Sequence, residues 1–197
     1  TAEWKLLSQS GIKSGYGVQW AAISLSSPRL LRVAYSEPDS PASQVNLQRG
    51  ATILTVNGVD LANGSDVDSL NNGLFRPSLG ATTTFVVQDA GATITRTIEM
   101  TAANITSTPV PKTLVGDIGG VRFGYLLFND HIATAETQLI SAVNQLKAAN
   151  IQELVLDLRY NGGGYLYIAS QLGYMLATPT VTGRTFEKLR YNDKRVA

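Results

Sequence analysis

Short runs of β-branched and other apolar residues recur through the first half of the chain, separated by glycine, proline and asparagine. Runs of this kind, bounded by turn residues, are typical of strands. Residues 15–103 are therefore predicted to form a β-rich unit. Its expected strands cover residues 19–25, 30–35, 52–56, 82–88 and 93–100, and Asn57–Gly58 predicts a tight hairpin turn after the third of them.

Two stretches within this unit have helical signals. Ser40 precedes Pro41, and a capping residue followed by proline at the first helical position predicts a short helix there. Residues 65–74 open with serine and aspartate and then place apolar residues at helical intervals, which predicts a second helix. On either side of the unit, residues 1–14 are expected to dock on the body of the protein. Residues 104–113, rich in threonine and proline, are expected to be a linker.

The second half, residues 114–197, changes to an alternation of strands and longer helices. A hairpin across two glycines is expected first, then a helix capped by Thr134 and ending at Asn150. A strand over residues 154–158 and a helix over residues 165–177 complete a β-α-β arrangement. The chain is therefore predicted to be α/β in this half and α+β overall. The apolar stripe of the first helix consists of Ala135, Leu139, Val143 and Leu146.

Composition narrows the function by exclusion. Of the 197 residues, 44% are hydrophobic and 16% charged, and the net charge is +1, so bulk charge implies no nucleic-acid partner. The chain has no cysteine and one histidine, so we expect no disulfide, no thiol nucleophile, no metal and no cofactor. No apolar run reaches the roughly 20 residues of a membrane helix. The chain opens at Thr1, without methionine or a signal region, so we expect a processed chain whose export signal is out of view.

Three consecutive glycines, residues 162–164, follow the strand and precede the helix of the second half. A dinucleotide fingerprint would need glycine where Tyr167 stands, and a phosphate loop would need lysine where Tyr165 stands. The chain therefore lacks the motif of a nucleotide-binding α/β domain. Two interpretations are left: a turn that is merely tight, or a turn whose exposed N–H groups stabilise an oxyanion.

Other polar residues near the turn have more ordinary interpretations. Asp157 and Arg159 lie two apart on one face of a strand, which favours a structural ion pair over catalysis. His131 could act as a general base, although a lone loop histidine is usually solvated or capping. Ser170 has no activating base beside it and is not favoured as a nucleophile. Among the tyrosines after the turn, Tyr165 abuts it and is the one candidate for a binding residue.

The sequence Leu-Val-Leu-Asp-Leu-Arg-Tyr-Asn-Gly-Gly-Gly at residues 154–164 resembles the core of the carboxyl-terminal processing (tail-specific) protease family. Members of that family are serine peptidases that carry a PDZ domain. Residues 40–58, which run from Ser-Pro-Ala to Val-Asn-Gly, are similar to PDZ sequences. Gly15-Tyr-Gly-Val18 resembles the family's carboxylate-binding loop. The two resemblances occur in the order that the family has, and together they are more specific than either alone.

The resemblance implies a PDZ domain over residues 15–103 and the first part of a serine-peptidase core over residues 114–197. It implies an enzyme that cleaves proteins near their C-termini, with protein or peptide C-termini as its partners. A backbone N–H of Gly163 or Gly164 would form part of the oxyanion hole, and His131 is a further catalytic candidate. A substrate peptide would bind as an added strand with its carboxylate near the loop. The implied substrate-binding residues are Gly15, Tyr16, Gly17, Val18 and Tyr165.

Departures from the family's sequence accompany the resemblance. Tyr160 and Gly162 stand where the family has glycine and proline, and Ala51 replaces an aspartate. The family's nucleophilic serine and its lysine lie partly or wholly after the turn, so we expect them beyond Ala197 and expect this fragment to be inactive alone. The alternative is a non-catalytic PDZ-type peptide-binding protein on the same scaffold. Family resemblance alone implies a periplasmic or cell-envelope location.

Overall fold

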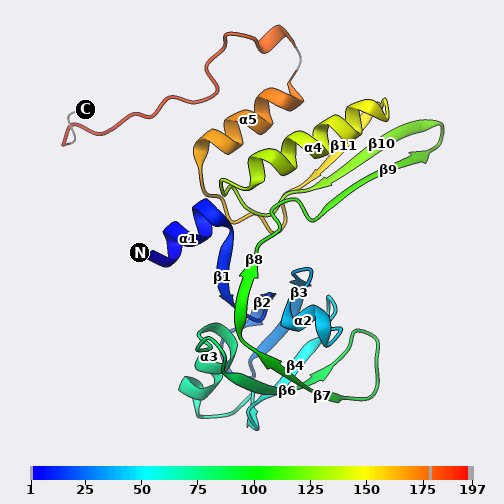
Figure 1. Cartoon of the computed structure of the whole chain (residues 1–197). Coiled ribbons are helices and arrows are strands. Elements are labelled where there is room, and N and C mark those ends of the chain that lie inside the picture. Colours follow the sequence, from blue (N-terminus) through cyan, green and yellow to red (C-terminus); the bar gives the residue numbers. More distant parts are fainter. Residues whose placement is uncertain (1, 178, 195–197) are drawn as a thin grey trace. The chain divides into compact units, whose positions relative to one another are not determined.

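The structure, a computed structural model, describes residues 2–177 and 179–194 (Figure 1). The chain divides into two compact units. The first consists of Thr1–Leu7 and Gly11–Thr108, and the second of Ser8–Ser10 and Pro109–Ala197. Thr1, in the segment expected to dock on the body, lies outside the described residues. Thr178 and residues 195–197, in the expected peptidase core, also lie outside them.

The first unit is built on an antiparallel sheet in the order β2-β3-β4-β6-β7, with β5 paired to β4. β1 and β8 form a separate two-stranded pair. The strands are β1 (Ile12–Gly15), β2 (Val18–Ser24), β3 (Leu30–Ser36), β4 (Thr52–Val56), β5 (Val59–Asp60), β6 (Thr82–Gln88), β7 (Arg96–Thr101) and β8 (Ala103–Thr106). The predicted helices are α2 (Pro41–Gln44) and α3 (Val67–Phe75), and an unpredicted helix, α1 (Ala2–Ser10), precedes β1.

Capping hydrogen bonds start both predicted helices of this unit. The Ser40 hydroxyl accepts a hydrogen bond from the Ser43 N–H at 3.2 Å, and Pro41 occupies the first helical position of α2. The Asp66 carboxylate accepts the Ser69 N–H at 3.0 Å and caps α3. The local signals in the sequence therefore predicted both helix starts correctly.

Alternation along the strands builds the core of the first unit. In β6, Thr83, Phe85 and Val87 are buried while the residues between them are not. Ala42 of α2 and Leu70 of α3 pack into the same core from the helices. The other large buried side chains of this core include Leu31, Val33, Leu47, Ile53, Val56, Leu61, Leu74, Ile98 and Met100.

The segment after β7 differs from its prediction. The sequence predicts a linker over residues 104–113, but β8 covers Ala103–Thr106 and β9 begins at Lys112. β8 forms because β1 pairs with it antiparallel, from Ile12 opposite Thr106 to Gly15 opposite Ala103. A strand partner from the start of the chain is invisible to local composition, so the prediction of an irregular segment is wrong there.

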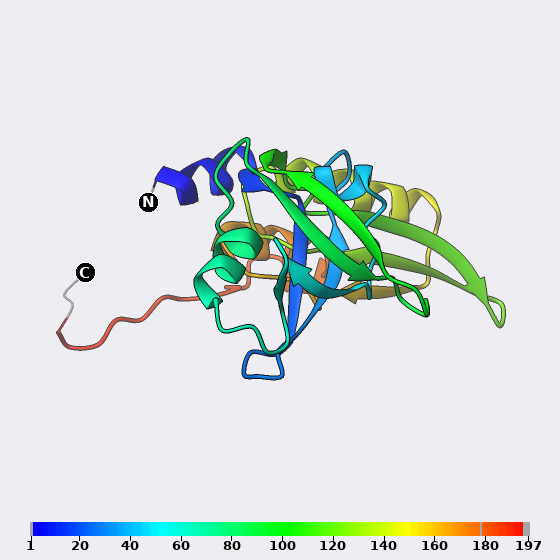
Figure 2. The same cartoon turned by 90° about the horizontal axis from the view of Figure 1, so that it is seen from below.

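The second unit has a three-stranded sheet in the order β11-β10-β9. β9 (Lys112–Ile118) and β10 (Val121–Leu127) form the predicted hairpin, and β11 (Glu153–Asp157) lies parallel to β10. The helix α4 (Ala135–Ala148) connects β10 to β11 and runs beside the hairpin (Figure 2). The helix α5 (Leu166–Leu176) follows the glycine turn, and Pro179–Val181 forms a short 3-10 helix after it. The fold class is therefore as predicted, α+β, with a PDZ-like β-rich unit before an α/β unit.

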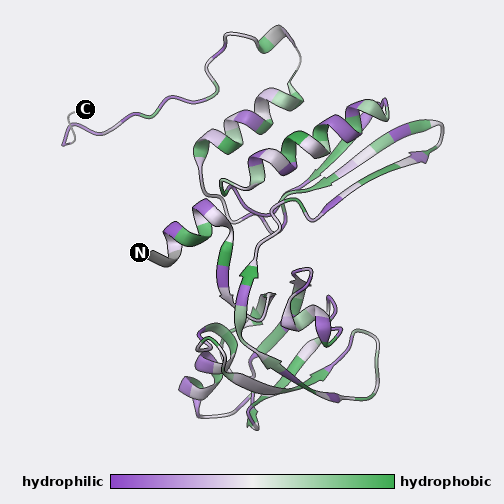
Figure 3. Ribbon diagram, in the orientation of Figure 1, coloured by the Kyte–Doolittle hydropathy of each residue, from purple (hydrophilic) through white to green (hydrophobic). Residues whose placement is uncertain are grey.

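Helix α4 differs from its prediction in two details. Thr134 precedes it, but the Thr134 side chain makes no capping hydrogen bond, because the backbone at Thr134 is itself helical. Ala142, not Val143, joins Ala135, Leu139 and Leu146 in the buried stripe, whose hydrophobic residues recur along the ribbon in Figure 3. Asn150 has the predicted left-handed conformation, with φ of 52°.

Among residues 2–177 and 179–194, no helix is long and apolar enough to cross a membrane. Within the same residues, no group of three or more histidine, aspartate or glutamate side chains is arranged to hold a metal ion.

Candidate functional site

The glycine turn extends the parallel pairing of β10 and β11 past the end of β11. Three backbone hydrogen bonds join it to the residues that follow β10. The Gly162 N–H donates to the Asn129 carbonyl at 3.0 Å, and the His131 N–H donates to the Gly163 carbonyl at 2.9 Å. The N–H of Tyr165 donates to the His131 carbonyl at 2.7 Å, which makes a parallel bridge between His131 and Gly164. Sheet hydrogen bonds therefore fix the turn in place.

The two N–H groups expected to form an oxyanion hole differ in their hydrogen bonding. The Gly163 N–H donates to the side-chain Oδ1 of Asn161 at 2.9 Å. The same Asn161 side chain donates through Nδ2 to the Phe128 carbonyl at 3.0 Å. The Gly164 N–H makes no hydrogen bond to any residue that the structure describes. Of the two candidates, Gly164 is therefore the one whose N–H is available for a ligand.

Backbone geometry requires glycine at both positions. Gly163 has φ of 82° and Gly164 has φ of 135°, which L side chains rarely adopt. A Cβ atom on Gly164 would also lie 2.4 Å from the His131 carbonyl oxygen, whereas one on Gly163 would meet nothing within 4 Å. Gly164 thus permits a close approach of two backbones.

The predicted ion pair between Asp157 and Arg159 is confirmed, and it stabilises the entry to the turn. Arg159 Nη2 lies 2.6 Å from the Asp157 carboxylate, which is buried. The Tyr125 hydroxyl donates to the same carboxylate at 2.6 Å. Hydrogen bonds from Arg159 and from Tyr125 hold the pKa of Asp157 well below its usual range. The pair has the expected structural role, but only Asp157 lies on a strand, because β11 ends there and Arg159 is in the turn that follows.

His131 contributes to the turn through its backbone. Its ring packs on Phe128, with the ring centroids 4.6 Å apart. Burial lowers the pKa of His131, which favours the neutral imidazole. Hydrogen bonds with the Asn161 side chain and the Gly163 backbone act in the opposite direction and raise the pKa. The buried Nδ1 atom has no hydrogen-bond partner in the described part of the chain. Among the residues that the structure describes, no carboxylate is hydrogen-bonded to the ring, so the role of His131 as a general base stays a prediction.

Tyr165 and Ser170, two other residues near the turn, contact the protein itself through their side chains or neighbours. The hydroxyl of Tyr165 donates to Ser8 Oγ at 3.0 Å, and its ring lies 5.4 Å from that of Tyr167. Tyr165 also packs against the apolar core of this unit. Ser170 lies half-buried on α5, and its neighbour Gln171 donates to Glu136 at 2.8 Å. The side chain of Tyr165 thus holds the backbone in place directly after the turn.

In the first unit, two N–H groups of the loop at residues 15–18 point opposite to the carbonyls that hold this loop in place. The Tyr16 carbonyl accepts the Ala42 N–H at 3.0 Å, and the Gly17 carbonyl accepts the Glu37 N–H at 2.7 Å. These peptide bonds are trans, so the N–H on the far side of each bond points the opposite way. Those donors belong to Gly17 and Val18.

A groove of about 280 Å³ lies in front of this loop, between β2 and α3. β2 is the edge strand of its sheet, so its outer backbone groups are open to a further strand. The Trp20 indole N–H donates to the Leu74 carbonyl at 3.0 Å and holds the two walls together. Sequence reasoning missed the α3 wall, Leu74 and Phe75, although their helical spacing could have indicated it.

Tyr16 enters this site through its backbone alone. Its side chain is 3% exposed, and its hydroxyl donates to Thr83 Oγ1 at 2.7 Å. Burial raises the pKa of Tyr16. The expected contact of Tyr16 with a peptide is therefore limited to main-chain atoms.

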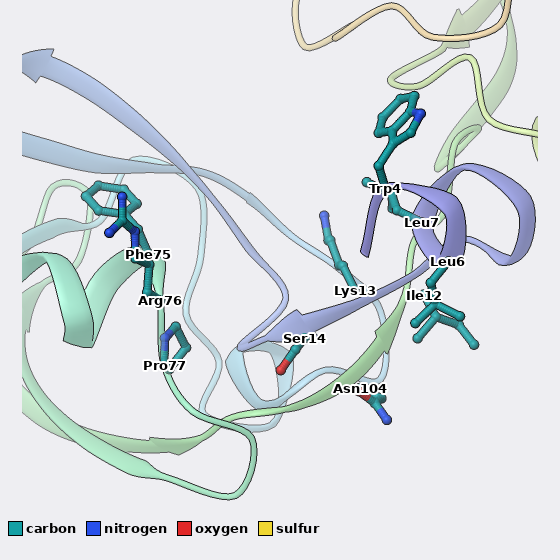
Figure 4. A pocket seen from close by; sticks show the side chains of 10 residues that line it. All are labelled: Trp4, Leu6, Leu7, Ile12, Lys13, Ser14, Phe75, Arg76, Pro77 and Asn104. Carbon is teal, nitrogen blue, oxygen red and sulfur yellow. The ribbon is translucent and has the colours of Figure 1, made fainter. Parts of the chain in front are cut away.

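A second pocket, of about 710 Å³, opens beside the groove (Figure 4). It shares Lys13, Ser14, Phe75 and Pro77 with the groove. Figure 4 shows Phe75, Arg76 and Pro77 on one side and the side chains of α1 and β1 on the other. Trp4, Leu6, Leu7, Ile12 and Asn104 complete the lining.

Comparison with known proteins agrees with the motifs. Residues 122–197 match the sequence profile of peptidase family S41. A carboxyl-terminal-processing protease of Picosynechococcus sp. (strain ATCC 27264 / PCC 7002 / PR-6) is 31% identical over 162 residues, which are 81% of this chain and 37% of the relative.

Solved structures agree in fold. A Bacteroides fragilis NCTC 9343 protein whose crystal structure is described as that of an S41 protease has a TM-score of 0.64 and 26% identity, over 93% of this chain and 50% of that one. The photosystem II D1 C-terminal processing protease has a TM-score of 0.57 and 22% identity, over 84% of this chain and 44% of that one. The chain thus spans half or less of the length of these relatives. Residues 122–197 thus resemble peptidase family S41, and the chain is similar to carboxyl-terminal-processing proteases.

Proposed function

We propose that the chain is the peptide-binding and oxyanion-stabilising part of a serine-type endopeptidase that cleaves proteins near their C-termini. In this proposal the nucleophilic serine and its lysine base are not among residues 1–197. The observation that carries this proposal is the Gly164 N–H, which is held in a fixed turn and has no hydrogen-bond partner among the described residues.

The chemistry of acyl transfer gives this donor its role. When a serine attacks a peptide carbonyl, the carbonyl oxygen gains negative charge, and a preorganised N–H stabilises that charge more than it stabilises the ground state. Glycine lets the scissile carbonyl approach the backbone closely. Removal of one such donor typically lowers kcat by about 100-fold to 1,000-fold. The fixed position of Gly164, set by hydrogen bonds on both sides of it, suits this function.

The PDZ-like unit would bind the substrate's C-terminus. The peptide would add as a strand to the open edge of β2, and the N–H groups of Gly17 and Val18 would hold its carboxylate. Phe75 and Leu74 would contact the last side chain. Two N–H donors on adjacent residues at the start of an edge strand support this assignment, since a carboxylate has two oxygens to accept them.

A second candidate function is a non-catalytic peptide-binding protein on the same scaffold. One observation favours it: Asn161 already occupies the Gly163 N–H, so the turn offers a single donor rather than two. In that case the groove would bind C-termini while the turn had only a structural role.

The resemblance to the protease family is the basis for a proposal about where the protein is located. We propose that the protein acts outside the cytoplasm, in the periplasm or cell envelope. Fractionation of cells of the native source would place it, and recovery in the cytoplasmic fraction would contradict the proposal.

Turnover by the full-length protein, isolated from its native source, tests the proposal. We expect it to cleave a peptide with a free C-terminus faster than the same peptide with an amidated one. Gly164→Ala should lower kcat by about 100-fold or more, because the Gly164 N–H would move when its Cβ meets the His131 carbonyl. Binding of the free-acid peptide without any cleavage would favour the binding protein. Unchanged kcat in Gly164→Ala would remove the oxyanion role.

A further inference from the structure

Gly164 presents a backbone donor and a backbone acceptor on one side. The carbonyl of Gly163 points at the His131 N–H, and the N–H of Tyr165 points at the His131 carbonyl. These two contacts fix the orientation of both peptide planes that flank Gly164. They therefore also fix where the atoms of Gly164 itself point.

Both peptide bonds are trans, so N–H and C=O point in opposite directions within each plane. Because the Gly163 carbonyl faces His131, the Gly164 N–H faces away from it. Because the Tyr165 N–H faces His131, the Gly164 carbonyl also faces away. A residue with both groups on its outer side is the hydrogen-bonding unit of a sheet edge.

Space on that side permits another chain to approach. Gly162, Gly163 and Gly164 are exposed, and a Cβ built on Gly163 would meet nothing within 4 Å. Gly164 has no side chain, and the atom that an added Cβ would meet first is the His131 carbonyl oxygen. Neither the N–H nor the carbonyl of Gly164 has a hydrogen-bond partner among residues 2–177 and 179–194.

Contacts on both sides hold this edge in position. Before it, Asn161 hydrogen-bonds both the Gly163 N–H and the Phe128 carbonyl. After it, the Tyr165 hydroxyl donates to Ser8, which is 1% exposed. A donor and acceptor pair that is already ordered loses little entropy when it binds a partner.

We propose that Gly164 binds one residue of an extended polypeptide through a two-hydrogen-bond bridge. The Gly164 N–H donates to the carbonyl of that residue, which in the proposed peptidase is the scissile carbonyl, and the Gly164 carbonyl accepts the N–H of the same residue. This inference rests on the proposed function, because it concerns the same polypeptide substrate, and it adds how that substrate is recognised. Recognition at Gly164 is by main chain, so side-chain identity matters little there. A proline or N-methylated residue is excluded where the N–H is needed.

Titration of the ¹⁵N-labelled 197-residue chain, followed by NMR, tests the bridge. The probe is N-acetylated, C-terminally amidated penta-alanine, which has no carboxylate for the loop of the first unit. We expect the Gly164 amide proton to move downfield and to exchange more slowly with solvent. An analogue in which every peptide nitrogen is methylated keeps the carbonyls but loses the N–H groups. It should bind about threefold to tenfold more weakly, as expected for one lost hydrogen bond.

An unmoved Gly164 amide, or equal binding of both peptides, would overturn the bridge. Gly164→Ala, whose Cβ would meet the His131 carbonyl, should abolish the response. If Gly164→Ala fails to fold, the titration of the unaltered chain still decides. The measurement needs no turnover, so the bridge and the peptidase activity can fail independently.

Discussion

The carboxylate of Glu37 accepts a hydrogen bond from the backbone N–H of Thr108, 71 residues later in the chain, at 3.1 Å. The same carboxylate accepts the Ser107 hydroxyl at 3.3 Å and lies 3.4 Å from Lys13 Nζ. Glu37 is 2% exposed, and its own N–H donates to Gly17 in the loop beside the groove. One buried acid therefore joins that loop, β1 and the end of the first unit.

Replacing Glu37 with alanine should destabilise the first unit by about 2–4 kcal/mol. The variant leaves the buried Ser107 hydroxyl and the part-buried Thr108 N–H without their acceptor. Urea denaturation followed by the fluorescence of Trp20, which lies in this unit, measures the effect. Glu99→Ala, an exposed acid in the same unit, is the control and should change stability by less than about 0.5 kcal/mol. Equal effects of the two variants would contradict the role given to Glu37.

Asn161→Ala should loosen the glycine turn without unfolding the second unit. The variant loses the hydrogen bonds to the Phe128 carbonyl and from the Gly163 N–H, which together are worth about 1–3 kcal/mol. We expect hydrogen exchange at Gly163 to become faster, since its amide is no longer protected. Asn192→Ala, which removes a contact with the Lys194 N–H in an exposed segment, is the control. Unchanged exchange at Gly163 would show that Asn161 does not order the turn.

Local chemistry allowed much of the fold to be predicted from sequence. The Ser40–Pro41 helix start, the Asn57–Gly58 turn and the left-handed Asn150 each depend on a few adjacent residues. The ion pair of Asp157 and Arg159 was also predictable, because opposite charges two residues apart at the end of an apolar strand are close enough to pair.

Contacts between distant segments were not predictable in the same way. β8 depends on pairing with β1, and the groove wall at Phe75 depends on how α3 packs against β2. The glycine turn was recognisable as a candidate site, but the choice between Gly163 and Gly164 was not. That choice depends on where the Asn161 side chain points and on a bridge to His131, which tertiary structure sets.

Asp157→Asn should destabilise the second unit in a pH-dependent manner. Hydrogen bonds from Arg159 and Tyr125 lower the pKa of Asp157 in the folded state, so folding favours the ionised carboxylate. Its stabilisation is fully present above the unfolded value of about 4 and is lost as pH falls through the lower, folded value. At pH 7 we expect a loss of about 1–3 kcal/mol relative to the unaltered chain.

The difference between Asp157→Asn and the unaltered chain should shrink as pH falls below about 4. Thermal or urea unfolding between pH 3 and pH 7 measures it. Asp117→Asn, an exposed position on β9, is the control and should show no such dependence. A difference that stays constant over this range would mean that packing, not the carboxylate charge, accounts for the effect.

Gly17→Ala should distort the loop that we propose binds a carboxylate. A Cβ on Gly17 would lie 2.3 Å from Ser40 Cβ, and φ is 76°. Gly91 has the same φ of 76°, but a Cβ there would meet nothing within 4 Å. Both alanine variants are strained at φ, so the extra loss of stability in Gly17→Ala, about 1–3 kcal/mol, reports the collision alone. Similar stabilities of the two variants, measured by urea denaturation, would mean that Ser40 moves aside without cost.

Phe75→Ala should weaken binding of a peptide with a free C-terminus if the terminal side chain lies in the groove between β2 and α3. Phe75 is 51% exposed and lines that groove, so its removal should raise Kd about threefold to tenfold through lost apolar contact. Leu6 is similarly exposed, at 47%, but lines only the second pocket (Figure 4). Calorimetric titration of Leu6→Ala should therefore give an unchanged Kd. If Leu6→Ala weakens binding as much as Phe75→Ala does, the peptide also occupies the second pocket, and the groove alone is not its site.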